Sequence, residues 1–277
     1  MPKVLKQEWF PTRPDIWFEG EMSVEDFKTQ YMLQFIDGAG QYLSKEEWDL
    51  LVKVGEFDWL HHGEYGEKYV AGIDFAGSDA EGADFTHITI LRITQNGIKQ
   101  KVWAKEMHGT SYPEQMREIA KIFGGTNPMF HTSAIFADFT GCGRPVVQTL
   151  QEEYGLTNLT GITFNGADTF TQSGMNMKNI MFAQFKNELA HGRIQYPKKD
   201  SFLKIMGTEY NGFYHKMVGE WKDLECEVKL TVNKKIEAPN GGHDDCCMAD
   251  VLANFAAMQG NRGSMPRPSG ARIFRKG

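Results

Sequence analysis

The chain has 277 residues, of which 41% are hydrophobic and 24% are charged, a composition typical of a folded globular protein rather than a disordered one. It contains no run of 18 apolar residues and begins MPKVLKQEWFPTRPD, so we expect neither a membrane span nor a signal peptide. The net charge of −6 excludes a protein coated in basic residues. The four cysteines include no CxxC pair, so the sequence suggests neither a zinc site nor a disulfide framework. A reducing cytoplasm is therefore the expected location.

Charge is unevenly distributed along the chain. Residues 1–68 carry 14 acidic and 7 basic residues, whereas residues 186–235 carry 10 basic and 7 acidic ones. The tail, 261–277, has five basic residues and no acidic one. Any contact with nucleic acid would therefore be local and on the C-terminal side. Random scatter combined with a disordered tail explains the same counts equally well.

The first 65 residues are predicted to form an extended and helical linker segment. Residues 1–20 contain three prolines and no clear period, as in an extended lead-in. A helix is expected to begin at Ser23, because aromatic residues then recur at every fourth position. A shorter helix is expected over 44–52, and the glycine-containing stretch 61–68 joins this segment to the main domain.

The main domain is predicted to be of the α/β class. Asn96-Gly97 between two apolar runs indicates a β-hairpin. Alternation of strands with helices after this hairpin predicts a mixed sheet with helices on its faces. Strands are expected at 69–74, 86–94, 99–105, 133–138 and 159–164, helices at 112–123, 146–154, 178–190 and 244–258, and a late hairpin between 213–218 and 226–232.

Aspartates follow two of the buried strands and begin the last helix. Asp74 and Asp138 end apolar strands, where open α/β sheets place their sites, and Asp244 and Asp245 stand at the start of the helix 244–258. Each residue alone is well explained as a turn or capping residue. Three acidic elements at one sheet edge would, however, repel one another unless cations lie between them. Hard oxygen ligands of this kind select Mg²⁺ or Mn²⁺.

Three segments together resemble the nuclease motifs of phage large terminase subunits, in the order and spacing of that family. They are GIDFAGSDAEGADFT, IFADFTGCGRPVVQTL and GGHDDCCMADVLANF. The resemblance covers about residues 66–260, and residues 27–48 resemble the segment that joins the ATPase of the packaging motor to its nuclease. It implies a ribonuclease-H-like nuclease domain at 66–260, a connector at 1–65 and a basic flexible tail at 261–277.

The resemblance also implies roles for individual residues. Asp74 would bridge two Mg²⁺ or Mn²⁺ ions, and Asp138, Asp244 and Asp245 would complete the metal-binding and catalytic set. Which of Asp244 and Asp245 is the closer ligand stays open. Asp84 and His243 would lie just outside the metal ligands, although a surface aspartate and a capping-loop histidine are equally good interpretations. The implied reaction is two-metal phosphodiester hydrolysis, which requires no nucleophilic side chain.

Double-stranded DNA is the substrate that the family implies, with little sequence specificity because no base-reading helix is evident. The implied partners are the portal protein, the small terminase subunit and an ATPase motor domain, in the host cytoplasm. The sequence contains no GxxxxGK[ST] motif, so the motor itself is not predicted in this chain. The candidate DNA-binding residues are Arg144, Lys198, Lys199, Lys234 and Lys235, and solvated surface lysine is the plainer interpretation of both lysine pairs.

Three other functions compete with this one. GIDFAG and ADFTGCG also suit a sugar-kinase-like or actin-like ATPase, although such enzymes need a second subdomain and leave His243-Asp244-Asp245 without a purpose. A resolvase or integrase would use the same metals but lacks the N-terminal segment. A non-catalytic module that docks on the portal has no need of aspartates at all three motifs.

Overall fold

A computed structural model of the chain describes residues 40–53, 55–75, 85–141, 143–164, 176–227, 235–239 and 242–261. The chain divides into two compact units, 1–40 and 41–277, and nearly all described residues belong to the second. The lead-in, the helix expected from Ser23, Asp84, Lys234 and the tail after residue 261 lie outside the described residues. No described helix is both long and apolar enough to cross a membrane.

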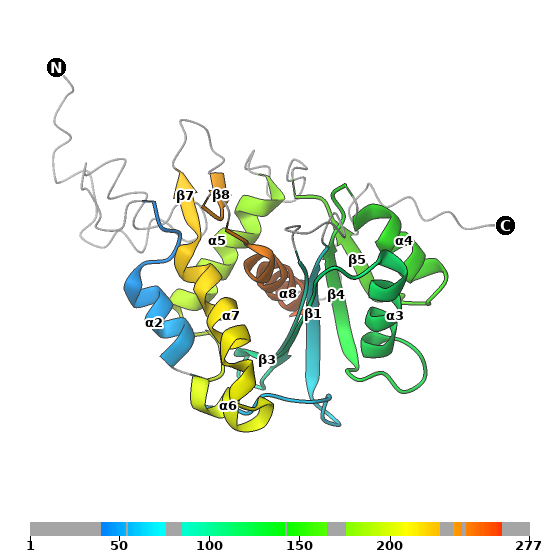
Figure 1. The fold of residues 1–277 in the computed structure, drawn as a ribbon, viewed down its shortest axis with the longest axis horizontal. Coiled ribbons are helices and arrows are strands. Elements are labelled where there is room, and N and C mark those ends of the chain that lie inside the picture. Colours follow the sequence, from blue (N-terminus) through cyan, green and yellow to red (C-terminus); the bar gives the residue numbers. More distant parts are fainter. Residues whose placement is uncertain are drawn as a thin grey trace, which may run out of the picture. The chain divides into compact units, whose positions relative to one another are not determined.

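A six-stranded mixed sheet lies at the centre of the second unit (Figure 1). Its strands are β1 (Lys68–Asp74), β2 (Thr86–Ile93), β3 (Lys99–Met107), β4 (Thr132–Asp138), β5 (Leu159–Ile162) and β6 (Ile194–Gln195), in the order β5-β4-β1-β2-β3-β6. β1, β2 and β3 pair antiparallel, whereas the pairs β1–β4, β4–β5 and β3–β6 are parallel. The mixed sheet predicted from the sequence is confirmed.

The turn between β2 and β3 forms at the predicted Asn96-Gly97. Gly97 has a φ of +77°, a conformation that glycine adopts without steric cost. The N–H of Thr94 donates to the carbonyl of Ile98 at 2.9 Å, and the N–H of Ile98 donates to the Thr94 hydroxyl at 3.1 Å. These bonds close the hairpin and hold β2 and β3 in register.

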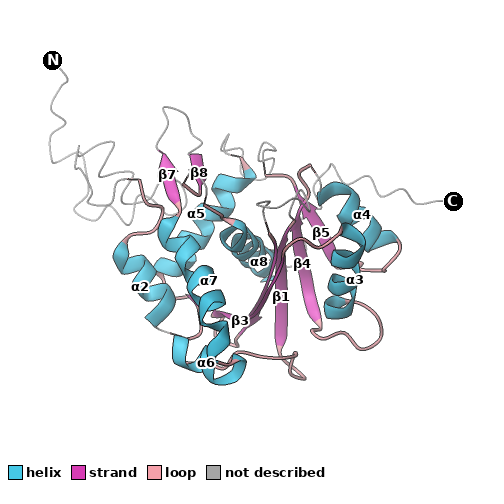
Figure 2. Cartoon of the chain, viewed as in Figure 1, coloured by secondary structure: helices cyan, strands magenta, loops and turns pink. Residues whose placement is uncertain are grey.

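Helices cover both faces of the sheet, as Figure 2 shows. On one face lie α3 (Tyr112–Phe123) and α4 (Gly143–Glu152), whose apolar side chains share a core cluster with Ile73 and Ile135. On the other lie α2 (Lys45–Lys53), α5 (Met177–Ala190), α7 (Asn211–Asp223) and α8 (Asp245–Asn261), which share a second cluster with Val70 and Leu91. Because both faces are covered, β1 is buried along almost its whole length and reads as a continuous apolar run.

The predicted late hairpin is wrong in its first strand. Residues 213–218 lie in α7, and their apolar side chains follow a helical period that continues to the fully buried Trp221. The strand after this helix, β7 (Glu225–Glu227), pairs instead with β8 (Lys235–Glu237). Two further helical elements, α6 (Lys199–Met206) and η3 (Thr208–Tyr210), precede α7 and were not predicted.

Residues 41–60 supply side chains to the cores of the folded unit. Tyr42, Leu51 and Trp59 are buried, and the Tyr42 hydroxyl donates to the Phe182 carbonyl at 2.5 Å. The expected division of the chain at residue 65 stays a prediction, but the second half of the proposed connector is packed into the same unit as the sheet.

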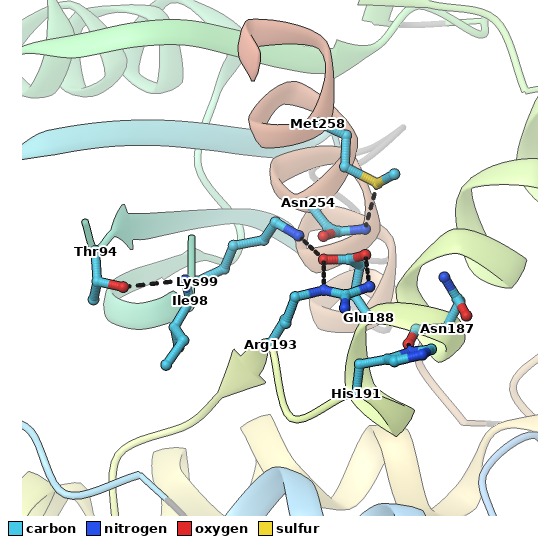
Figure 3. Close-up of polar contacts among 9 residues, drawn as sticks. All are labelled: Thr94, Ile98, Lys99, Asn187, Glu188, His191, Arg193, Asn254 and Met258. Atoms are coloured by element: carbon cyan, nitrogen blue, oxygen red, sulfur yellow. Dashed lines mark hydrogen bonds and ion pairs between the residues drawn. The ribbon is translucent and has the colours of Figure 1, made fainter. Parts of the chain in front are cut away.

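Buried ion pairs fasten the helices to the sheet. Glu188 of α5 accepts two hydrogen bonds from Arg193, at 2.9 and 2.6 Å, and also pairs with the buried Lys99 of β3 (Figure 3). Nearer the middle of the sheet, the fully buried Lys101 lies 2.8 Å from Asp250 of α8. Both contacts combine opposite charges with further hydrogen bonds, so the buried charges are compensated.

Candidate metal-dependent nuclease site

Two of the predicted aspartates lie side by side because they end neighbouring parallel strands. In the β1–β4 pair, Ile73 is in register with Ala137, so Asp74 and Asp138 follow directly at the same edge of the sheet. Asp138 is further held by its own loop, because the N–H of Thr140 donates to Asp138 Oδ1 at 2.8 Å. The carboxyl ends of parallel strands are the usual location of functional sites in such sheets.

The third acidic element reaches this edge because α8 lies directly against β1. A Cβ atom added at Gly72 would stand 2.0 Å from the carbonyl oxygen of Ala249 and 2.5 Å from the backbone nitrogen of Ala253. Only a residue without a side chain therefore permits this approach. Asp74 lies two residues after Gly72 on β1, and Asp245, the first residue of α8, lies one helical turn before Ala249. The contact between Gly72 and Ala249 therefore brings Asp74 and Asp245 near each other.

Asp74 interacts electrostatically with the other three aspartates. Burial raises the pKa of Asp74 well above its ordinary value, and the negative charges of Asp138, Asp245 and Asp244 raise it further. Burial also raises the pKa of Asp138, although hydrogen bonds from Thr140 and the charge of Lys178 oppose the rise. We call Asp74, Asp138, Asp244 and Asp245 the acid cluster.

Asp244 and Asp245 occupy different surroundings within the acid cluster. Asp245 is buried, with 4% of its surface exposed, and its Oδ2 accepts the N–H of Phe85 at 3.2 Å. The same oxygen lies 3.6 Å from His243 Nδ1. Asp244 is only half-buried, and its Oδ2 lies 3.4 Å from Lys178 Nζ. Asp245 is therefore held by a backbone hydrogen bond, whereas the partly exposed Asp244 side chain is paired with Lys178.

The acid cluster fits a divalent cation in its chemistry. All four side chains offer carboxylate oxygens, the ligand type that hard divalent cations prefer, and Lys178 lies beside Asp244. Among the described residues, however, no three His, Cys, Asp or Glu side chains are already arranged to enclose one ion. The side chains would have to turn toward a bound cation, and Asp244 has the most freedom to do so.

Comparison with known proteins agrees with this geometry. Residues 71–256 match the model of a family described as the terminase RNaseH-like domain. The chain belongs to this family. The matched segment contains all four members of the acid cluster and most of the sheet. A comparison with curated proteins gives no match.

Solved structures of terminase nucleases share the fold. The large terminase nuclease of the thermophilic phage G20c, solved with bound magnesium, is 16% identical over 77% of this chain and 96% of that chain, with a TM-score of 0.53. The nuclease domain of the Thermus phage P74-26 large terminase is 14% identical over 75% and 91%, with a TM-score of 0.50. A mutant of the corresponding part of the phage Sf6 large terminase, with calcium, is 10% identical over 77% and 98%, with a TM-score of 0.50. The expected ribonuclease-H-like fold is confirmed.

Four of the five predicted DNA-binding residues are described, and these four lie toward two different ends of the sheet. Arg144 is exposed in the first turn of α4, and its guanidinium lies 5.1 Å from the ring centre of Phe139, directly after Asp138. Lys235 is exposed on β8 and pairs with Glu237. Both lie on elements that adjoin the acid cluster in sequence, so contact with DNA stays a prediction for each.

Lys198 and Lys199 lie at the opposite end of the sheet. They begin α6, next to β6, which pairs with the first residues of β3 (Figure 1). Lys198 pairs with Glu56, and Lys199 Nζ lies 3.0 Å from His215 Nε2. The structure therefore does not bring these two lysines to the acid cluster.

Lys178 is a site residue that the motifs do not reveal. It stands in the first turn of α5, whose start is capped by Asn176, and its charge lowers the pKa of both Asp74 and Asp138. It is the residue that the structure places 3.4 Å from Asp244. No spacing in the sequence links Lys178 to an aspartate 66 positions later, so only the packing of α5 beside α8 identifies it.

Proposed function

We propose that this terminase domain is a metal-dependent endonuclease that cuts double-stranded DNA concatemers during viral genome packaging. The observation that carries the proposal is the placement of four aspartates at the ends of β1 and β4 and at the start of α8 in a terminase RNaseH-like sheet. The related nucleases of phages G20c and Sf6 have been solved with magnesium and with calcium, which supports a divalent cation here. Two Mg²⁺ or Mn²⁺ ions are the proposed cofactors.

When bound, such ions activate a water molecule and stabilise the leaving 3′ oxygen of the scissile phosphodiester. Asp74, at the centre of the acid cluster, is proposed to bind both ions. Asp138 and Asp245 are proposed as ligands that their backbone hydrogen bonds keep in place. Asp244 would complete the set when its partner Lys178 turns away toward a DNA phosphate.

Residues around the acid cluster are proposed to orient the DNA. Arg144 would bind a phosphate beside Asp138, because its guanidinium is exposed and held over Phe139. His243 is proposed to orient a phosphate or water next to Asp245. Asp84 is proposed to lie just outside the metal ligands and Lys234 to contact DNA, and both residues lie outside the described part of the chain. Contacts with backbone phosphates alone would give cleavage with little sequence specificity.

The proposed nuclease would work within a packaging assembly. A packaging nuclease would act in the host cytoplasm with an ATPase motor domain, a portal protein and a small terminase subunit. The family match favours this role over a sugar-kinase-like ATPase. Unrestrained cutting would destroy the genome being packaged, so we expect weak activity of the isolated domain.

The test is cleavage of supercoiled and linear plasmid with Mn²⁺, Mg²⁺ or EDTA. We expect wild-type cutting with either metal and a loss of roughly 1000-fold or more in Asp74→Ala, because the residue at the centre of the acid cluster is removed. Asp223→Asn, an exposed acid at the end of α7, is the matched control and should cut normally. Cutting in EDTA, or equal cutting by Asp74→Ala, would disprove the proposal.

A further inference from the structure

Glu220 of α7 makes an unusual contact with the first turn of α8. Its side chain is buried, with 8% of the residue exposed, and its Oε2 accepts the backbone N–H of Cys246 at 2.7 Å. The first N–H groups of a helix have no partner within the helix, so an acceptor from elsewhere in the chain satisfies one of them. The acceptor here comes from a different helix, so the bond joins α7 to the start of α8.

Neighbouring residues of α7 contact the same turn. The thiol of Cys246 donates to the carbonyl of Met217 at 3.5 Å. Lys216, one helical turn before Glu220, pairs with Glu106 of β3 and places its Nζ 3.2 Å from the ring centre of Phe85. Phe85 in turn donates its N–H to Asp245. α7 therefore contacts Cys246, which follows Asp245 in the chain, and Phe85, which is hydrogen-bonded to Asp245.

The Glu220 carboxylate is only partly satisfied by these contacts. Within the described part of the chain, its Oε1 is buried and has no hydrogen-bond partner. A buried carboxylate oxygen without a partner is unfavourable for folding. An apolar residue of similar size would fill this space without an unpaired buried oxygen, so packing alone does not account for glutamate at this position.

We propose that Glu220 is a positioning residue for the acid cluster, which holds the first turn of α8, and with it Asp244 and Asp245, at the end of β1 through its hydrogen bond to Cys246. This inference rests on the proposed function, because it assigns the bond a purpose in metal binding. Glu220 itself does not have to contact the metal or the DNA. Outer residues of this kind commonly change metal affinity by about 10- to 100-fold when they are replaced.

The test measures Mn²⁺ affinity by calorimetry without DNA, together with the melting temperature in EDTA. Glu220→Ala removes the acceptor, and we expect about tenfold weaker Mn²⁺ binding. Glu220→Gln keeps an acceptor for the Cys246 N–H and should stay within about threefold of wild type. Glu220→Asp keeps a carboxyl group but withdraws the acceptor by one methylene, so it should bind Mn²⁺ as weakly as Glu220→Ala does.

A matched control separates positioning from general loosening of α7. Val218→Ala removes buried apolar atoms from the same helix and leaves the Glu220 bond in place. It should melt earlier than wild type and yet bind Mn²⁺ normally. If Glu220→Ala does not fold, Glu220→Asp and Glu220→Gln decide the question between them.

Each outcome has one meaning. Normal Mn²⁺ affinity in a folded Glu220→Ala or Glu220→Asp protein, with only a lower melting temperature, would show a structural role and overturn the inference. Weak binding in Glu220→Gln as well would also overturn it, because the hydrogen bond would then not be the cause. Absence of Mn²⁺ binding in the wild type would overturn the proposed function along with it.

Discussion

Buried carboxylates at the two ends of the sheet have neighbours of opposite charge. At the end where β3 begins, Glu188 lies between Lys99 and Arg193, so two positive charges meet one negative charge (Figure 3). At the other end, the four carboxylates of the acid cluster share the charge of Lys178. The first arrangement is balanced by charges of the protein itself, whereas in the second a bound cation would balance the carboxylates. The proposed metal site therefore lies at the unbalanced end.

The pKa values express the same contrast. Burial acts to raise the pKa of Glu188, but the hydrogen bonds and charges of Arg193 and Lys99 bring it down to about 2. For Asp74, burial and the neighbouring carboxylates act in the same direction, and the pKa is raised well above its ordinary value. Burial alone does not distinguish a structural carboxylate from a functional one, because the sign of the neighbouring charge decides.

The largest effect on stability is expected at the balanced end. Glu188→Gln leaves the buried Lys99 without a counter-charge, so the free energy of unfolding should fall by about 3 kcal/mol. The matched control is Glu118→Gln on α3. Glu118 also lies between two lysines, Lys105 and Lys121, but those pairs are partly exposed, and the change should be under about 1 kcal/mol. Urea unfolding measures both, and equal losses would contradict the comparison.

At the acid cluster, removal of a charge should have the opposite effect. Asp74→Asn relieves repulsion among the carboxylates, so we expect unfolding in EDTA at neutral pH to become harder by about 1–2 kcal/mol while cleavage is lost. Thermal melts in EDTA, with Asp223→Asn as control, check this expectation. A less stable Asp74→Asn protein would mean that the acid cluster is not under charge repulsion.

The dependence of stability on pH should differ in sign between the two ends. Glu188 has a folded pKa of about 2 against an ordinary value of 4.5, so its contribution is present above 4.5 and is lost as the pH falls toward 2. Asp74 has a raised pKa, so its unfolded form ionises first, near 3.8, and stability falls as the pH rises above that value. Thermal melts of wild type, Glu188→Gln and Asp74→Asn at a series of acidic to neutral pH values measure both effects. The loss of stability at low pH should be smaller in Glu188→Gln, and the loss of stability with rising pH should be smaller in Asp74→Asn.

The smallest expected effect concerns Lys178. Lys178→Gln removes the cation that faces Asp244, so the metal-free protein should lose about 0.5–1 kcal/mol of stability. Saturating Mn²⁺ should abolish the difference, since bound ions replace the missing charge. Lys222→Gln, at an exposed position on α7, is the control. A loss that persists in Mn²⁺ would mean that Lys178 stabilises the fold in another way.

The sequence predicts the acid cluster well because each aspartate is next to a strong local signal. Asp74 and Asp138 end apolar runs whose β1–β4 pairing then places them together. Lys178 and Glu220 carry no such signal, because their positions depend on how α5 and α7 pack against α8. The strand prediction for residues 213–218 is wrong because six residues are too few to separate a strand from one buried helical turn.

Gly72 also limits how this site could be transplanted into another protein. An engineer who grafts four aspartates onto a different α/β scaffold would copy the chemistry but not the spacing, because the helix must approach the strand backbone where Gly72 leaves room. Even alanine at this position would push against the carbonyl of Ala249 and displace the helix that carries Asp245. For the same reason, a relative with every aspartate intact and a bulkier residue here is expected to have lost the alignment of its site.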